Sequence, residues 1–172
     1  MIVRRATVAD VEAIARVHVQ AWQESYLGLL PQAAIDERPV ETRIKQWHNT
    51  LANLDRPTFV ADENGAVSGF VSGGPILWSG LSTGSEVSAL YLLDMAKRRG
   101  VGRALFTAML GELAAREFTS AGLWVLTTNA PARRFYETMG GRIGETRLDR
   151  RGKFVFDDTA YIWDDLAAFT LV

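Results

Sequence analysis

The chain contains no cysteine and only two histidines in 172 residues. The lack of cysteine excludes disulfide bonds, thiol nucleophiles and thiolate metal ligands, and it is typical of a protein kept in a reducing compartment. His18 and His48 form neither an H-x-x-x-H nor an H-x-E pattern. Because zinc sites need such groupings, we predict no metal site, and we expect His18 to lie in the core.

An excess of one charge is also missing, since 19 basic residues face 20 acidic ones and the net charge is −1. This balance excludes a global field that would attract nucleic acid or an anionic membrane. No stretch approaches the roughly 20 apolar residues of a membrane span, and residues 1–7 lack the apolar core of a signal peptide. We therefore predict a cytoplasmic protein with no membrane or nucleic-acid partner.

Internal repeats, linkers and low-complexity segments are absent as well, so we predict a single domain, residues 1–172. A chain of this length buries roughly 70% of the surface that its unfolded form exposes, enough for one core. Asn64-Gly65, between two alternating segments, predicts an antiparallel hairpin. Gly73-Gly74-Pro75 is expected to interrupt the second strand, and the polar residues 79–85 are expected to form a mobile loop.

Hydrophobic periodicity predicts a strand, two helices, a three-stranded meander, a helix, a strand, a helix and two closing strands. The strands are expected at residues 2–6, 58–62, 67–72, 86–93, 123–127, 142–147 and 154–163. The helices are expected after Thr7, over 40–54, after Gly102 and over 131–139. This order is typical of an α+β fold, a mixed sandwich in which helices flank a mixed sheet.

The most informative stretch joins an apolar strand to a helix through a basic glycine turn. The strand residues 87–93 are almost all apolar, which favours burial on both faces. After Gly102 apolar residues recur at helical spacing, so the turn precedes a helix N-terminus, where free backbone N–H groups bind anions. Lys97, Arg98, Arg99 and Arg103 add cations, which indicates a polyanionic ligand such as a pyrophosphate.

Other interpretations of this turn remain. The glycines serve only the backbone if the cations are an ordinary solvated surface. A dinucleotide-binding fingerprint is excluded because Leu105 occupies the position of its third glycine, and no P-loop pattern is present. Nucleic-acid binding is disfavoured because one basic cluster lacks the spread of cations and stacking aromatics that such surfaces use.

Two segments together resemble the GCN5-related N-acetyltransferases, the GNAT superfamily. Lys97-Arg98-Arg99-Gly100-Val101-Gly102 is similar to the acyl-CoA motif [QR]-x-x-G-x-[GA], with lysine in place of the first Gln or Arg. Residues 129–140, NAPARRFYETMG, are similar to the downstream segment N-x-x-A-x-x-[FL]-Y-x-x-x-G. The resemblance covers nearly the whole chain and implies the acyl-CoA N-acyltransferase fold, whose central mixed sheet splays apart to hold pantetheine.

The resemblance also implies which residues bind acetyl-CoA, the acyl-donor cosubstrate. The main chain of Leu90, Tyr91 and Leu92 would hold pantetheine and acetyl, and Asn129 and Arg133 would contact cofactor amides and phosphate. The pyrophosphate would lie on the glycine turn, which comprises Lys97, Arg98, Arg99, Gly100, Val101, Gly102 and Arg103. Tyr136 completes the set of cofactor-binding residues.

Two side chains are catalytic candidates for acetyl transfer to an amine. An alkyl ammonium with a pKa near 10.4 is neutral in roughly one molecule in 2,500 at pH 7, so a base is valuable. Glu86, at the start of the central strand, is the candidate base, acting directly or through water, although a strand-end carboxylate is often simply solvated. Tyr136 is the candidate acid for the leaving thiolate, the alternative being a packed tyrosine beside Phe135.

The acceptor is not specified by the sequence. Trp22 and Tyr26 are predicted to line an aromatic mouth, with Trp47 and Trp78 nearby, although interhelical packing explains the same residues. The acidic residues Glu24, Asp36 and Glu37 could attract a cation. We predict an acetyl-CoA-dependent N-acetyltransferase that acts on a primary amine of a small molecule or peptide by direct transfer in a ternary complex. The alternative is a non-catalytic acyl-CoA sensor.

The closing strands leave the oligomeric state open. Phe154, Phe156 and Trp163 suggest a surface for a homodimer, and core packing explains them equally well.

Overall fold

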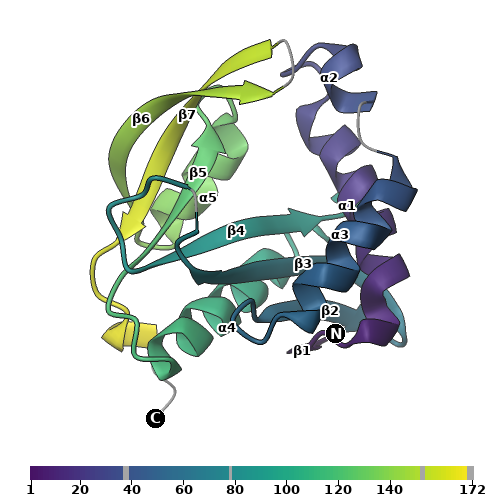
Figure 1. Cartoon of the computed structure of the whole chain (residues 1–172), viewed down its shortest axis with the longest axis horizontal. Helices are drawn as coiled ribbons and strands as arrows, with labels where there is room; N and C mark the ends of the chain where they lie inside the picture. The colour runs from purple at the N-terminus through teal and green to yellow at the C-terminus, as the bar shows by residue number, and fades with distance from the viewer. Residues whose placement is uncertain (37–38, 78, 152–153, 170–172) are drawn as a thin grey trace.

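One seven-stranded sheet organises the computed structural model, which describes residues 1–36, 39–77, 79–151 and 154–169 (Figure 1). The strands lie in the order β1-β2-β3-β4-β5-β7-β6. Because β4 and β5 are parallel and the other neighbours are antiparallel, the predicted mixed sheet is confirmed. The strands are β1 (Ile2–Arg5), β2 (Thr58–Glu63), β3 (Ala66–Pro75), β4 (Ser85–Leu92), β5 (Ala121–Leu126), β6 (Arg142–Arg151) and β7 (Phe154–Trp163).

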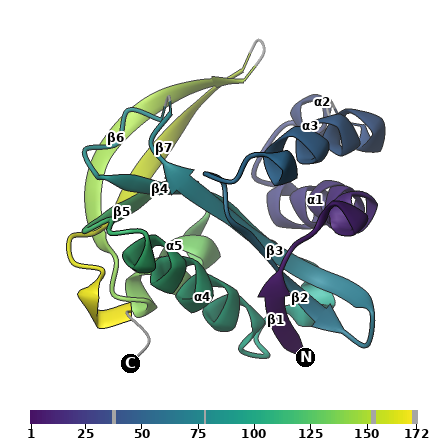
Figure 2. The same cartoon turned by 60° about the horizontal axis from the view of Figure 1, so that its bottom comes forward.

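Helices cover both faces of the sheet (Figure 2). One face carries α1 (Val11–Tyr26), α2 (Gln32–Asp36) and α3 (Val40–Ala52), and the other carries α4 (Val101–Ala115) and α5 (Ala130–Thr138). The short α2 was not predicted from the sequence. None of the helices in the described ranges is long and apolar enough to cross a membrane.

Local chemistry explains the turns and helix ends. Asn64 and Gly65 have φ angles of 55° and 88°, the left-handed backbone that a tight hairpin turn requires. The predicted antiparallel pair β2–β3 is therefore confirmed. Asn129 caps α5, because its Oδ1 accepts a hydrogen bond from the N–H of Ala132, and Gly140 follows the helix with a φ of 84°.

The predicted apolar stripe of α4 forms the centre of the larger core. Val101, Leu105, Phe106, Met109, Leu110 and Leu113 are all buried there, together with side chains of β5, β7 and α5. A second core lies between the sheet and the α1–α3 pair. His18 belongs to this side, as predicted, and its Nδ1 accepts a hydrogen bond of 3.1 Å from the Trp47 indole N–H.

Two predictions about β3 and β4 were wrong. β3 does not stop at Gly73, because Gly73, Gly74 and Pro75 pair with Val87, Glu86 and Ser85 of β4. Proline is tolerated at this strand end, where one ladder N–H is dispensable. β4 is buried only in its first half, whereas Leu90, Tyr91 and Leu92 are half-buried.

The incomplete burial of β4 follows from its pairing with β5. The two strands pair only at Ser85↔Ala121 and Glu86↔Gly122, and beyond Glu86 the described residues provide no strand on this side of β4. An opening therefore separates the last six residues of β4 from β5.

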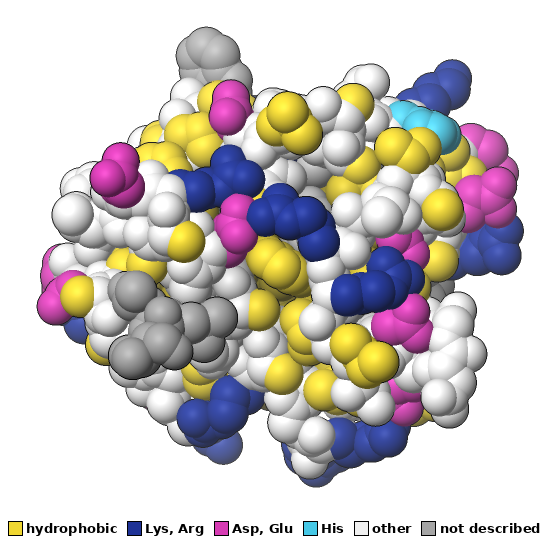
Figure 3. All heavy atoms as spheres, turned by 90° about the horizontal axis from the view of Figure 1, so that it is seen from below, with side chains coloured by type: hydrophobic (Ala, Val, Ile, Leu, Met, Phe, Trp, Pro, Cys, Tyr) yellow, Lys and Arg dark blue, Asp and Glu magenta, His cyan; other side chains and the backbone are white. Residues whose placement is uncertain are grey.

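The surface carries charges of both signs. Over the face seen in Figure 3, basic and acidic side chains lie interspersed among apolar atoms. Arg5 and Arg116 both pair with Glu112, for example, and Arg4 pairs with Asp10 and Asp62. This mixing agrees with the near-zero net charge of the chain.

Candidate active site

The opening between β4 and β5 contains a cavity of about 450 Å³, a volume typical of small-molecule sites. One wall comes from α1, α3 and β4, and the other comes from β5, β6, β7 and the loop before β4. The lining residues are His18, Trp22, Tyr26, Arg43, Ser79, Leu81, Glu86, Val87, Ser88, Ala89, Tyr91, Leu123, Trp124, Leu126, Arg147, Asp149, Arg150 and Asp158.

A β-bulge in β4 determines which side chains enter this cavity. Gly73 pairs with Val87 while Ser72 pairs with Ala89, so Ser88 is an extra residue without a partner in the β3–β4 ladder. A bulge reverses the alternation of side chains along a strand. Glu86 and Ala89 consequently share one face of the sheet, although an even number of residues separates them.

Glu86 is a buried, ion-paired carboxylate. Its Oε1 accepts a hydrogen bond of 2.9 Å from Nη2 of Arg56, and the two side chains are 9% and 10% exposed. The interpretation of Glu86 as an ordinary solvated strand-end carboxylate is therefore wrong. The pair holds the carboxylate at the last point where β4 and β5 meet.

The glycine turn has the geometry of an anion site. Arg98 and Gly100 have φ angles of 58° and 82°, both left-handed, so successive N–H groups turn toward one side. No backbone N–H from Arg98 to Arg103 donates a hydrogen bond to another described residue. These donors, at the start of a 15-residue helix, fit a pyrophosphate.

The four cations of the turn are not equivalent. Lys97 contacts Asp94 at 2.6 Å and Arg99 contacts Glu63 at 3.3 Å. Arg98 and Arg103 form no ion pair within the described residues, so they are the cations best placed to meet a new anion.

Tyr136 lies on the opposite face of the sheet from Glu86. It belongs to the α4 core, where its ring packs against Phe106, Phe135 and Trp163, and it does not line the cavity. Burial raises the pKa of the Tyr136 phenol, and the electrostatic interaction with the nearby Tyr26 hydroxyl raises this pKa further. The phenol is thus held in its protonated form, able to donate a hydrogen bond.

Asn129 and Arg133 already have partners within the fold. Asn129 uses Oδ1 as the α5 cap, which leaves its Nδ2 without a hydrogen bond among the described residues. Arg133 donates from Nε to the Tyr161 hydroxyl and from Nη1 to the Thr127 carbonyl, both at 3.1 Å. Their contacts with acetyl-CoA remain a prediction.

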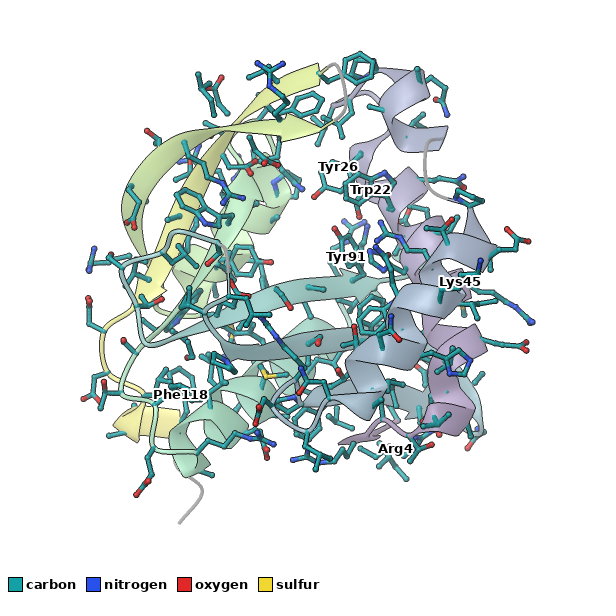
Figure 4. All side chains as sticks on the ribbon, in the orientation of Figure 1. Arg4, Trp22, Tyr26, Lys45, Tyr91 and Phe118 are labelled. Atoms are coloured by element: carbon teal, nitrogen blue, oxygen red, sulfur yellow. The ribbon has the colours of Figure 1, made fainter. Side chains whose placement is uncertain are left out.

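The predicted aromatic mouth is present in part. Trp22, Tyr26 and Tyr91 point toward the space between α1 and the β5–β7 strands (Figure 4), and all three line the cavity. The Trp22 and Tyr26 rings lie 4.3 Å apart. Trp47 is instead buried between helices, so the packing interpretation is correct for it. Trp78, Glu37 and the side chain of Asp36 lie outside the described residues.

The aromatic residues of β7 have different surroundings. Trp163 is a core residue, 4% exposed, and its indole N–H donates to the Met139 carbonyl. Phe156 packs against a cluster formed by Trp22, Leu30, Ile35 and Leu126, which joins α1 and α2 to β5. A role in dimerisation is thus excluded for the Trp163 indole and remains a prediction for the rest.

Comparison with known sequences assigns the chain to a family. The sequence model of the acetyltransferase (GNAT) family matches residues 17–140. The Bacillus subtilis protein YuaI, named as an uncharacterized N-acetyltransferase, is 32% identical over 168 residues, which are 96% of this chain and 94% of the relative. The chain belongs to the GNAT acetyltransferase family.

Solved structures confirm the acyl-CoA N-acyltransferase fold of this GNAT protein. The PaiA N-acetyltransferase of Thermoplasma acidophilum, in complex with coenzyme A, has a TM-score of 0.72 at 19% identity and covers 92% of this chain and 96% of its own. YncA of Salmonella typhimurium, with its cofactor acetyl-CoA, has a TM-score of 0.73 at 21% identity. The match covers 95% of this chain and 93% of YncA. The chain is thus an acyltransferase by family, and it has the fold of these acetyltransferase structures.

Sequence reasoning missed several of the residues that line the cavity. Arg43, Trp124, Arg147 and Asp158 line it but were not singled out. Charged residues inside the closing strands were the available signal, because a strand rarely buries a charge without a function or a partner. Within the described residues no group of three or more histidine, aspartate or glutamate side chains could hold a metal ion.

Proposed function

We propose that this single domain transfers the acetyl group of acetyl-CoA to a primary amine, directly and in a ternary complex. The observation that carries the proposal is that β5 does not pair with β4 beyond Glu86. Among the described residues, this part of β4 lies between a helix N-terminus whose first amides donate no hydrogen bond and a cavity with a buried carboxylate. The coenzyme A and acetyl-CoA complexes of the two structural neighbours support the choice of donor.

The residues around the opening divide the work of binding the donor. The backbone N–H groups from Arg98 to Arg103 would bind the pyrophosphate, with Arg98 and Arg103 adding charge. The main chain of Leu90, Tyr91 and Leu92, in the part of β4 that β5 does not pair, would hold pantetheine and the thioester, as an added strand would be held. A thioester lying there has the cavity of Glu86 on one face of the sheet and Tyr136 on the other.

The two catalytic groups act from these opposite faces. Glu86, directly or through a water, accepts a proton from the acceptor ammonium so that its nitrogen can attack the thioester carbonyl. The N–C bond forms as the C–S bond breaks, and the nitrogen then loses a second proton, which ends on the departing sulfur as coenzyme A thiol. Backbone amides of β4 along the opening stabilise the charge on the carbonyl oxygen. Tyr136 donates a hydrogen bond to the departing sulfur, and its raised pKa favours this hydrogen bond over full transfer of the phenol proton.

The experiment is release of free coenzyme A thiol from acetyl-CoA across a panel of amines, with mass spectrometry of the acceptor. An acceptor mass gain of one acetyl group, matched by one thiol released, is expected. The second candidate, a sensor, is supported by the same binding geometry. It predicts acetyl-CoA binding with an intact thioester in every mixture, and that result would exclude the enzyme.

A further inference from the structure

The cavity wall formed by β5, β6 and β7 carries a fixed guanidinium, that of Arg147. Its Nη1 donates to the Ser79 carbonyl at 2.8 Å, and its Nη2 lies 3.5 Å from Oδ2 of Asp158. The guanidinium also lies over the Trp124 ring, 4.3 Å from the centroid. The Trp124 indole N–H donates to the same Ser79 carbonyl. Stacking and hydrogen bonds together fix the orientation of the guanidinium, as a preorganised binding group requires.

This wall also has unused hydrogen-bonding capacity. The Asp158 side chain is only 1% exposed, but that of Arg147 is 32% exposed. Nε of Arg147 and Oγ of Ser79 are covered from solvent and make no hydrogen bond with any described residue. Buried polar atoms without partners are rare in folded proteins and call for an explanation such as a missing ligand. Nε of Arg147 can only donate and the Ser79 hydroxyl can also donate, so a ligand oxygen that accepts would satisfy both.

The charges around the cavity argue against a polycation as the acceptor. Among the described lining residues, Arg43, Arg147 and Arg150 balance Glu86, Asp149 and Asp158. Glu86 is further neutralised by Arg56 behind it. A polyamine would bring several positive charges into a cavity with no net negative charge to attract them.

From these features we infer that the acceptor is an amine that carries a carbonyl or carboxylate oxygen a few bonds away, as amino acids and peptide N-termini do. The inference rests on the proposed function. The amine faces Glu86, the oxygen binds at Arg147 and Ser79, and an apolar substituent packs on Trp22, Tyr26 and Tyr91. Arg147 is then a specificity-determining residue for the acceptor.

The test compares four amines of related shape: phenylalaninamide, free phenylalanine, phenethylamine and cadaverine. For each, kcat/KM is expressed per neutral amine, so that differences in amine pKa do not enter. A carbonyl or carboxylate compound is expected to exceed phenethylamine by at least about tenfold, the size of one or two hydrogen bonds, and cadaverine is expected to be the poorest. Comparing the amide with the free acid separates a peptide-like acceptor from an amino acid.

Variants assign the preference to this wall. Ser79→Ala removes only the hydroxyl and keeps the carbonyl that Arg147 and Trp124 use. Arg147→Lys keeps the positive charge and removes the planar guanidinium, with its fixed set of N–H donors. Each should raise the KM of the carbonyl acceptor by about tenfold with little change in kcat or in acetyl-CoA affinity. Ser82→Ala is the matched control on the same loop, because its hydroxyl contacts Glu145 and lies outside the cavity lining.

The outcomes separate the two proposals. Equal turnover of phenethylamine and phenylalaninamide, or a preference for cadaverine, would overturn the inference and leave acetyl transfer standing. A preference that survives in both Ser79→Ala and Arg147→Lys would also overturn it. If Arg147→Lys does not fold, Ser79→Ala decides alone. Failure of every amine to release thiol, with acetyl-CoA bound, would instead refute the proposed function.

Discussion

Two arginine–carboxylate pairs face one cavity, and they differ in how far each is closed off. Arg56 and Glu86 are 2.9 Å apart, with both side chains about 90% buried. Arg147 and Asp158 are 3.5 Å apart, and here only the carboxylate is sealed while a third of the arginine is exposed. In the first pair the carboxylate faces the cavity with its arginine behind it. In the second both side chains line the cavity, and the arginine is by far the more exposed of the two.

The difference shows that the same kind of ion pair can present either an acceptor or a donor to a cavity. A buried charge needs a partner to remain in place. Glu86 is presented as an oxygen base or acceptor, whereas Arg147 is presented as a donor. The two walls therefore offer opposite hydrogen-bonding character to the same small molecule.

The largest effect is expected when the sealed pair is broken. Arg56→Met leaves Glu86 as an uncompensated buried carboxylate and should lower the free energy of unfolding by about 3–5 kcal/mol. Urea denaturation of both proteins measures this loss of unfolding free energy. The double variant Arg56→Met, Glu86→Gln should recover most of the loss, and a double variant no more stable than Arg56→Met would show that the charge of Glu86 is not the cause.

Removing the carboxylate alone tests its chemistry. Glu86→Gln should lower kcat/KM on the order of 10²-fold near pH 7, because the neutral amide cannot accept the ammonium proton. The loss should shrink as pH rises and the amine deprotonates by itself. A loss that is equal at all pH values would assign Glu86 a structural role.

Tyr136 provides the matching test on the other face of the sheet. Tyr136→Phe should reduce kcat on the order of 10²-fold while acetyl-CoA affinity stays nearly constant, since only one hydroxyl is lost. The measurement is single-turnover acetyl transfer beside equilibrium binding. Wild-type kcat with chemistry rate-limiting would show that the phenol serves packing alone.

The more open pair should give a smaller and different effect. Asp158→Asn removes the charge that holds Arg147 and should raise the acceptor KM about tenfold with kcat retained. Steady-state kinetics with the best acceptor of the panel measure this split. A fall in kcat at constant KM would place Asp158 in the chemical step. Asp158 would then resemble Glu86 and would not act by positioning Arg147.

A third ion pair, Arg4–Asp10, lies away from the cavity and is expected to have the smallest effect of the three when it is broken. Arg4 is 37% exposed and holds Asp10, whose pKa is lowered to about 2 from 3.8, chiefly by hydrogen bonding to Arg4. A folded-state pKa below the unfolded value means that the pair stabilises the fold above about pH 4, and that this contribution is lost as the pH falls through about 2.

Asp10→Asn should therefore cost about 1 kcal/mol at pH 7, after allowance for solvent screening of Arg4, and almost nothing at pH 2. Thermal unfolding of both proteins across this pH range measures the difference. A cost that does not change with pH would point to the hydrogen bonds from Thr7 to Asp10, which a neutral amide also disturbs.

The sequence was most informative where function depends on neighbours along the chain. The turn 97–103 and the α5 segment 129–140 could be interpreted because glycine spacing, a cap and a helix start are local properties. The depth of Glu86 could not be predicted, since it depends on Arg56, 30 residues earlier. The Ser88 bulge left no trace in the alternation pattern, because its neighbours are apolar on both sides.

The second wall was beyond sequence reasoning for the same reason. Ser79, Trp124, Arg147 and Asp158 come from four separate segments, and only the pairing of β5, β7 and β6 brings them together. The extension of β3 through Gly73-Gly74-Pro75 is a further tertiary effect, because β4 supplies the partners that this segment would otherwise lack.

The two residue pairs that join β4 to β5 also have a mechanical consequence. The two parts of the sheet, β1–β4 and β5–β7, are joined by strand pairing only at Ser85↔Ala121 and Glu86↔Gly122. A second connection is the cluster in which Phe156 of β7 packs with residues of α1 and α2. A change in the width of the opening therefore requires the sheet to bend at these two residue pairs. Because Glu86 belongs to one of them, such a hinge motion would also move the Glu86 carboxylate.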